Sequence, residues 1–216
     1  MIKLIKKEFM LAMHPIVPMM VLLSAMVLIP NYPYIVIFFY VSMAVFFTCL
    51  SGRENNDVVY SLNLPVAKKN IVKARFAFAI ILEFVQLLIM IPFAVLNQNI
   101  NPTGNQAGMD ANIALFAIAF IVYGLFNFVF FNSYYKNVSK VGIAFIKSSV
   151  LLFILTGIDV ISTHGVPFVR DVLDTPDSEY LMQKVIFLLF GLLAYLILTA
   201  ITYKISVMNF EKQDLN

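Results

Sequence analysis

The residues best placed to do chemistry in this sequence are ionisable side chains inside apolar runs. Glu83 and Lys147 each lie in such a run, about two turns and about one turn from the same end. Charged groups in a membrane are costly and often functional. We expect Glu83 and Lys147 to form an intramembrane pair, because pairing keeps both charges away from bare lipid. The alternative is a proton or substrate role. Asp159 lies near the opposite end of its run, where water is its expected surrounding.

The remaining reactive residue types do not form a catalytic or metal site. Hydrolysis by a carboxylate pair needs two acids at one place, and Glu83 and Asp159 are expected in opposite leaflets. His14 and His164 are expected on opposite membrane sides, which excludes a shared zinc ion. Cys49 is the single cysteine, so it supports neither an intrachain disulfide nor a Cys-based metal site. The sequence has no G-x-x-x-x-G-K-[ST] loop for ATP. We therefore expect no catalytic, cofactor-binding or metal-ligating residue in this chain, and we expect that it is not an enzyme.

Composition places the chain in a membrane. Hydrophobic residues make up 61% of its 216 residues, charged residues 12%, and 21 are Phe. A soluble domain of this length could not bury that much apolar surface. The net charge of +3 does not imply a nucleic-acid partner, because in membrane proteins the placement of charges matters more than their sum.

The apolar runs predict an all-α integral membrane protein with one transmembrane domain, 1–216. Each run is near the ~20 residues that a helix needs to cross ~30 Å of hydrocarbon. Long continuous runs also exclude a transmembrane barrel, whose strands alternate in polarity. The segment Met1–Met10 is expected to form an amphipathic helix in the membrane interface, with a simple basic flank as the alternative. The six predicted transmembrane helices are 11–30, 33–51, 76–97, 112–132, 143–162 and 184–203.

The distribution of Lys and Arg predicts the orientation of these helices. Thirteen of the 15 basic residues lie on the side that carries both termini, and Arg170 and Lys184 lie on the other. Cytoplasmic loops carry an excess of basic residues. Both termini are therefore expected in the cytoplasm, and the membrane is expected to be the plasma membrane.

The longest polar stretch, ENNDVVYSLNLPVAKKNIVKAR, lies in the predicted cytoplasmic loop 52–75. Asn and Asp residues at its start are good helix N-caps, and LNLP ends the short helix that follows. A short helix held out from the membrane suits docking of a soluble partner by helix-in-groove contacts. The alternative is a solvated connector whose lysines only set topology. The candidate contact residues are Glu54, Asn55, Asp57, Tyr60, Leu62, Leu64 and Pro65.

This loop and the six-helix pattern resemble the membrane subunits of type-2 ATP-binding-cassette (ABC) exporters, in particular small bacterial permeases. The family segment runs Glu, several residues, then Ser-Leu-Pro-Val-small-Arg/Lys-Lys-x-Ile-Val before helix three. Here Asn63 is inserted before Leu64, and Lys stands where Arg is common. The matching residues are Glu54, Ser61, Leu64, Pro65, Val66, Lys68, Lys69, Ile71, Val72 and Arg75.

The resemblance implies a set of partners. About Glu54–Leu64 would be the coupling helix that contacts a separate nucleotide-binding subunit, which would bind ATP and Mg. The N-terminal interfacial helix would be a second contact, and a second permease subunit, identical or paralogous, would complete the transporter in a bacterial plasma membrane. The alternative function is a non-transporting membrane scaffold or sensor that docks a cytoplasmic partner through loop 54–75.

Spacing predicts a short helix near Phe168 and Val172, and the family has an extracellular helix at this place between helices five and six.

The cargo is predicted from apolar side chains. Family members line their path with helices two and five, where a Phe- and Met-rich surface suits a hydrophobic or amphipathic substrate. The closest analogues export amphipathic peptides such as phenol-soluble modulins or antimicrobial peptides. Lipid-facing Phe is the alternative explanation. The path candidates are Phe39, Met43, Phe46 and Phe153.

Overall fold

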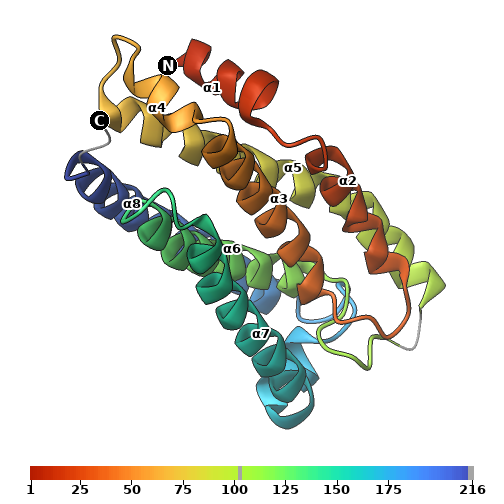
Figure 1. Ribbon diagram of the computed structural model, residues 1–216. Coiled ribbons are helices and arrows are strands. Elements are labelled where there is room, and N and C mark those ends of the chain that lie inside the picture. The colour runs from red at the N-terminus through yellow and green to blue at the C-terminus, as the bar shows by residue number, and fades with distance from the viewer. Residues whose placement is uncertain (102–103, 214–216) are drawn as a thin grey trace.

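Figure 1 shows a bundle of helices in a computed structural model that describes residues 1–101 and 104–213. Every regular element in these ranges is helical, which confirms the predicted all-α fold. Two short elements, η1 and η3, are π-helical turns, and η2 is a 3-10 helix. The elements are α1 (Ile2–Lys7), η1 (Glu8–Ala12), α2 (Val17–Leu22), η2 (Leu23–Leu28), α3 (Ile35–Glu54), α4 (Asp57–Leu62), α5 (Lys68–Ile100), α6 (Ile113–Tyr134), α7 (Val141–Gly165), η3 (Val169–Leu173) and α8 (Leu181–Glu211).

Five of these helices, α3, α5, α6, α7 and α8, are long and apolar enough to cross a membrane. The shortest has 20 residues, which gives about 30 Å at 1.5 Å per residue. A sixth span exists only if the two bent N-terminal segments count as one. The structure therefore supports five to six of the six predicted spans.

The predicted first span, 11–30, is not one straight helix. The helical segments Ile2–Ala12 and Val17–Leu28 meet at 93°. Pro15 explains the break, because it has no N–H and disfavours helical conformation at the residue before it. The correction leaves Val17–Leu28 with a length of about 20 Å, short of a full crossing.

The corner between these segments is held by hydrogen bonds. His14 Nδ1 accepts from the backbone N–H of Ile16 at 3.1 Å. The backbone N–H of His14 donates to Thr48 Oγ1, on α3, at 3.3 Å. His14 is therefore a corner residue that ties the N-terminal segment to α3.

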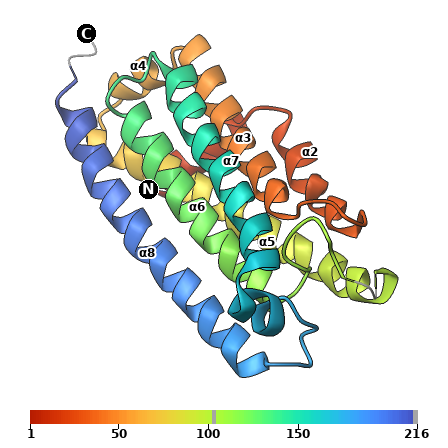
Figure 2. The same ribbon diagram turned by 90° about the horizontal axis from the view of Figure 1, so that it is seen from below.

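The tightest helix contact in the bundle is between α6 and α8, which both views show side by side (Figures 1 and 2). A Cβ atom added to Gly191 would lie 2.5 Å from the carbonyl oxygen of Ala117. One added to Gly124 would lie 3.3 Å from the Cα of Tyr195. Small residues allow this close backbone approach, as is common between membrane helices.

The bundle has two ends with different contents. The terminal end holds α1, α4 and the last turn of α8 (Figure 1), where Lys68 Nζ donates to the carbonyl of Gln213 at 2.8 Å. The far end holds residues 104–112, η3 and the start of α8, which hydrogen bonds connect to one another and to the loop between η3 and α8. Between the two ends, large apolar side chains such as Phe153 and Phe190 are exposed on α7 and α8. An exposed apolar belt of this extent fits lipid rather than water.

Candidate functional site

Four charged side chains from separate segments meet at the terminal end. Arg75 Nε lies 2.6 Å from Glu8 Oε2, and Arg75 Nη2 lies 2.8 Å from Asp57 Oδ2. Lys7 Nζ lies 2.8 Å from Asp57 Oδ1 and 3.1 Å from Glu8 Oε1. We call Lys7, Glu8, Asp57 and Arg75 the ion network. It joins α1, η1, α4 and α5.

The ion network is balanced, with two cations against two carboxylates, and Glu8 and Arg75 are buried while Lys7 and Asp57 are half-buried. Glu8 is 1% exposed and Arg75 is 4% exposed. Lys7 also donates to Ser61 Oγ on α4 at 3.0 Å, and Arg75 Nη1 lies 3.7 Å from Cys49 Sγ. Buried charges persist only when they are paired and hydrogen-bonded, and removing one partner is strongly unfavourable. The network therefore fixes α4 against the bundle.

The backbone around α4 explains how Asp57 reaches this network. α3 ends at Glu54, and Asn56 takes a left-handed conformation with a φ of 53°, which an Asn tolerates better than most residues. The chain reverses there, and Asp57 becomes the first residue of α4. A carboxylate at this position is also favoured by the partial positive charge of the helix N-terminus.

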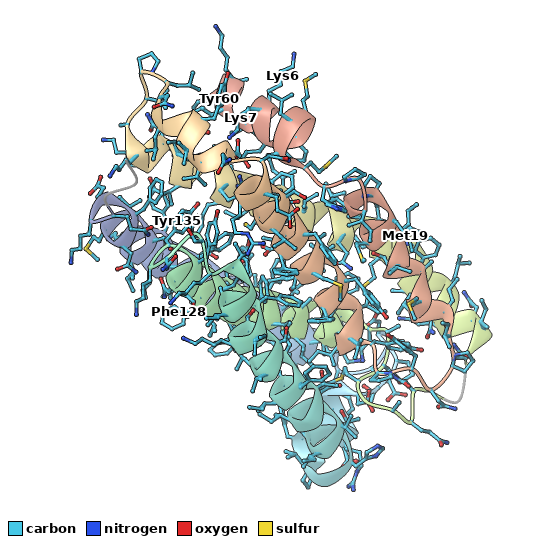
Figure 3. The ribbon with its side chains drawn as sticks, viewed as in Figure 1. Lys6, Lys7, Met19, Tyr60, Phe128 and Tyr135 are labelled. Atoms are coloured by element: carbon cyan, nitrogen blue, oxygen red, sulfur yellow. The ribbon has the colours of Figure 1, made fainter. Side chains whose placement is uncertain are left out.

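The residues predicted to contact a partner lie around α4 with different exposures. One face of α4 is open, because Val59 and Tyr60 are 44% and 60% exposed while Ser61 is buried. Figure 3 places Tyr60 beside Lys6 and Lys7 at the terminal end. A hollow of about 220 Å³ lies beside Tyr60, with Leu11 on its wall. Of the predicted set, Glu54, Asn55, Tyr60 and Pro65 are exposed, and Asp57, Leu62 and Leu64 are half-buried. Contact of these residues with a partner stays a prediction.

Sequence reasoning missed the ion network as a unit. The signal was present, since Glu8 is the only acidic residue in the basic segment Met1–Met10 and Arg75 is the only Arg in α5. Neither residue type reveals its partner. Lys7 and Asp57 are 50 positions apart, Asp57 and Arg75 are 18 positions apart, and Glu8 lies at the other end of the network from Arg75 in the chain, so the four meet only through folding. Glu54, the first of the predicted contact residues, instead pairs with the neighbouring Arg53 at 3.6 Å in solvent.

The predicted Glu83–Lys147 pair is wrong. Glu83 is buried on α5, where Glu83 Oε1 accepts from Asn127 Nδ2 at 2.9 Å and Glu83 Oε2 accepts from Tyr195 OH at 2.5 Å. Lys147 is exposed on α7, which packs against α3 and α6 rather than beside Glu83. Hydrogen-bond donors from α6 and α8 thus replace the expected cation, and the long Lys147 side chain can extend toward the interface.

Glu83 belongs to a line of buried polar residues along α5. At 100° per residue, Arg75, Glu83, Gln86 and Asn97 fall within an arc of about 80° on one face of the helix. All four are buried. Gln86 Nε2 donates to the carbonyl of Ile37 at 2.9 Å, so this line ties α5 to α3 as well as to α6 and α8. α5 therefore carries polar attachments from the ion network to the far end.

Three of the four path candidates gather on the contact between α3 and α7. The rings of Phe39 and Phe46 stack on Phe145, with centroids 5.8 Å and 4.0 Å apart. Phe39 also lies 6.2 Å from Phe153, beside a cavity of about 30 Å³. Met43 is half-buried on the same helix as Phe39. The structure brings these side chains together, and their contact with cargo stays a prediction.

The far end contains a set of acidic residues that sequence analysis did not predict to lie together. Asp159 is buried rather than open to water, and Asp159 Oδ2 accepts from the backbone N–H of Met109 at 3.3 Å. Asp174 Oδ1 accepts from the backbone N–H of Asp110 at 2.7 Å. Burial raises the pKa of Asp174 to about 7, and it also raises the pKa of Asp110. The carboxylates thus fold the segment 104–112 onto the loop before α8.

A short helix does lie between α7 and α8, at η3. Phe168 directly precedes it and is exposed, and Val172 within it is half-buried. Leu173 is buried at its end and anchors the turn to the bundle. Among the described residues, no group of three or more His, Cys, Asp or Glu side chains is arranged to hold a metal ion.

Five to six long apolar helices with an exposed apolar belt define a multi-pass membrane protein. The chain matches the family described as ABC-2 family transporter protein over residues 3–211, and it belongs to that family. The resemblance to ABC transporter membrane subunits is thereby confirmed. The family is a transport membrane component that pairs with ATPase subunits and is not itself catalytic. Neither a curated protein nor a solved structure matched the chain.

Proposed function

We propose that this chain is the membrane subunit of an ABC exporter and that α4 is its coupling helix. The observation that carries the proposal is the double attachment of Asp57, at 2.8 Å to Arg75 on α5 and at 2.8 Å to Lys7 near the N-terminus. A helix used to transmit movement needs one rigidly held face and one open face. Ser61 lies on the held face of α4, and Tyr60 lies on the open one.

The attachments give a path for movement. ATP binding would close two nucleotide-binding subunits, which hold the ATP and Mg, and would displace α4 with them. Asp57 would pass that displacement to Arg75 at the start of α5, and Lys7 would pass it to the N-terminal helix. Rigid helices move as bodies when their packed contacts are retained, and the polar line on α5 retains such contacts with α3, α6 and α8.

The orientation that goes with this role puts the terminal end in the cytoplasm. Most basic residues, including the lysines beside α4, lie at that end, while Arg170 and Lys184 lie at the far end. The excess of basic residues on one side supports cytoplasmic termini in a bacterial plasma membrane. In this orientation η3 is the extracellular helix, and Met1–Met10 lies in the cytoplasmic interface.

The cargo in this proposal is a hydrophobic or amphipathic molecule, with an amphipathic peptide as the preferred class. The aromatic cluster of Phe39, Phe46, Phe145 and Phe153 supports it, because adaptable apolar side chains suit such cargo. Phe153 is exposed on the outer side of this cluster. A second permease subunit, identical or paralogous, would face it and complete the path.

The first test is reconstitution with candidate ATPase subunits. Tyr60→Asp places a charge on the open face of α4, and Tyr180→Asp is the matched control, since these tyrosines are 60% and 49% exposed at opposite ends. We expect Tyr60→Asp to lower co-purification and coupled ATPase activity at least tenfold, with Tyr180→Asp close to wild type. Absence of an ATPase partner, or a complex indifferent to Tyr60, would favour the scaffold or sensor alternative.

Export is tested separately from docking. Proteoliposomes containing the complex should move a fluorescent amphipathic peptide in an ATP-dependent manner, and Phe39→Ala with Phe46→Ala should reduce that transport while ATPase assembly persists. Transport unaffected by these variants would contradict the proposed path.

A further inference from the structure

An apolar groove of about 450 Å³ lies between α5 and α6, away from both the ion network and the aromatic cluster. Its volume is in the range of small-molecule binding sites, roughly 300 to 1,000 Å³. Apolar side chains form almost all of its wall, to which α8 contributes Leu188. The wall residues that define its shape are Phe84, Leu88, Ile91, Phe116 and Phe120.

The groove opens toward the surface that would face lipid. Leu88, Ile91 and Val95 all line it and are exposed. They belong to the middle and far parts of α5, which the terminal-end ion network does not reach. Hydrocarbon rather than water would meet this opening.

The polar atoms of the groove are gathered at one end. Gln98 lies two positions before the last residue of α5, and Asn112 is the N-cap of α6. Asp177 Oδ2 accepts from Gln98 Nε2 at 3.0 Å, and Asp177 Oδ1 accepts from the backbone N–H of Ile113 at 3.0 Å. This end therefore coincides with the level at which two membrane helices end, which is where head groups lie.

Asp177 retains capacity for a further donor. Its side chain is 30% exposed, and a carboxylate has about four lone-pair sites. The nearest cation, Lys184 Nζ, is 4.0 Å from Asp177 Oδ1 and donates at 2.7 Å to the carbonyl of Pro176 and at 2.5 Å to that of Thr175. Lys184 is thus engaged mainly by backbone carbonyls.

We propose that this groove binds one acyl chain of a membrane phospholipid whose ammonium head group donates a hydrogen bond to Asp177. The fifteen residues from Phe84 to Gln98 span about 21 Å of helix, enough for the ~15 Å depth of one leaflet. Phosphatidylethanolamine carries the required N–H donors. Phosphatidylcholine has no N–H donor, and phosphatidylglycerol carries a net negative charge toward Asp177, so the expected order of affinity is ethanolamine, choline, glycerol.

The chain contains no Trp, so a single introduced Trp reports on lipid contact without background. Leu88→Trp places the probe in the groove. Leu193→Trp is the matched control on α8, because Leu88 and Leu193 are 65% and 56% exposed and each lies twelve positions from the far end of its helix. The full chain would be reconstituted in phosphatidylcholine vesicles containing increasing fractions of phosphatidylethanolamine brominated on its acyl chain.

We expect bromine quenching of Leu88→Trp to reach half its maximum at a several-fold lower fraction of the brominated lipid than quenching of Leu193→Trp. Adding Asp177→Asn should bring the two curves together, and brominated phosphatidylglycerol should show no preference for the groove. Identical curves for both probes would overturn the site, since they indicate ordinary boundary lipid. Protection of Leu88→Trp from quenching would also overturn it, because cargo or a second copy of the chain would then fill the groove. If Leu88→Trp does not fold, Phe116→Trp provides a second probe in the same groove.

Discussion

Asp57 Oδ2 lies 2.8 Å from Arg75 Nη2, and this contact links the first residue of α4 to the beginning of a 33-residue membrane helix. The contact makes the positions of α4 and α5 depend on each other. It is also shielded from water, because Arg75 is buried and Asp57 is half-buried. Shielding keeps the attraction strong in the salt of a cell, where an exposed pair would be screened.

Replacing Arg75 should destabilise the protein strongly. Arg75→Leu leaves the buried Glu8 carboxylate and Asp57 with Lys7 as the one cation of the network, and breaking a buried ion pair costs about 3–5 kcal/mol. The matched control is Arg53→Leu, since Arg53 forms a solvent-exposed pair with Glu54 worth less than about 1 kcal/mol. Denaturant titration in detergent checks both variants, and equal small losses would contradict the structural role of the ion network.

Glu83 should depend on its hydrogen-bond donors and not on Lys147. Glu83→Leu leaves the Asn127 amide and the Tyr195 hydroxyl without an acceptor, which costs about 1–3 kcal/mol, while Glu83→Gln retains an acceptor and should cost less. Lys147→Ala should change the free energy of unfolding by under about 0.5 kcal/mol, as exposed substitutions usually do. A loss for Lys147→Ala that matches Glu83→Leu would restore the rejected ion pair.

The sequence was informative where structure is local. Five spans follow from run length and hydropathy alone, because a helix that satisfies its own backbone hydrogen bonds is the stable form of a long apolar run in lipid. The position of α4 likewise follows from local signals, with Asn56 and Asp57 before it and Pro65 after it.

The sequence was not sufficient where distant neighbours decide. Pro15 breaks the N-terminal segment, whereas Pro92 lies inside α5 without ending it. Both prolines stand in apolar runs, and neighbouring contacts determine which one the helix tolerates. The partners of Glu83 were hidden for the same reason, since Asn127 and Tyr195 reach it only after three helices have packed together.

The close approach of α6 and α8 should make Gly191 intolerant of a side chain. In Gly191→Ala the new Cβ would lie 2.5 Å from the Ala117 carbonyl oxygen, so the helices must separate, at about 1–3 kcal/mol. Gly157→Ala is the control, because nothing lies within 4 Å of its added Cβ and Ala is favoured over Gly in a helix by about 1 kcal/mol. The melting temperature should therefore fall for Gly191→Ala and should stay unchanged or rise for Gly157→Ala. Shifts of the same sign would argue against this contact.

Protonation of Asp174 should make the far end more stable at low pH. Burial raises the pKa of Asp174 to about 7; the charges of Asp110 and Asp159 also raise it, against a hydrogen bond from the Asp110 backbone and the nearby His164, which lower it. In the unfolded chain, an Asp side chain has a pKa of about 3.9.

Between about pH 4 and about pH 7 the folded protein therefore holds a proton that the unfolded chain has lost. The stabilisation is complete below about pH 4 and is lost as the pH rises through about 7. The melting temperature should fall from about pH 5 to about pH 8 in wild type, and less steeply in Asp174→Asn. Asp171→Asn is the control, because Asp171 is exposed and the hydrogen bond from Arg170 lowers its pKa, so its substitution should leave the wild-type slope in this range. A slope in Asp174→Asn equal to that of wild type would assign the pH dependence to another group.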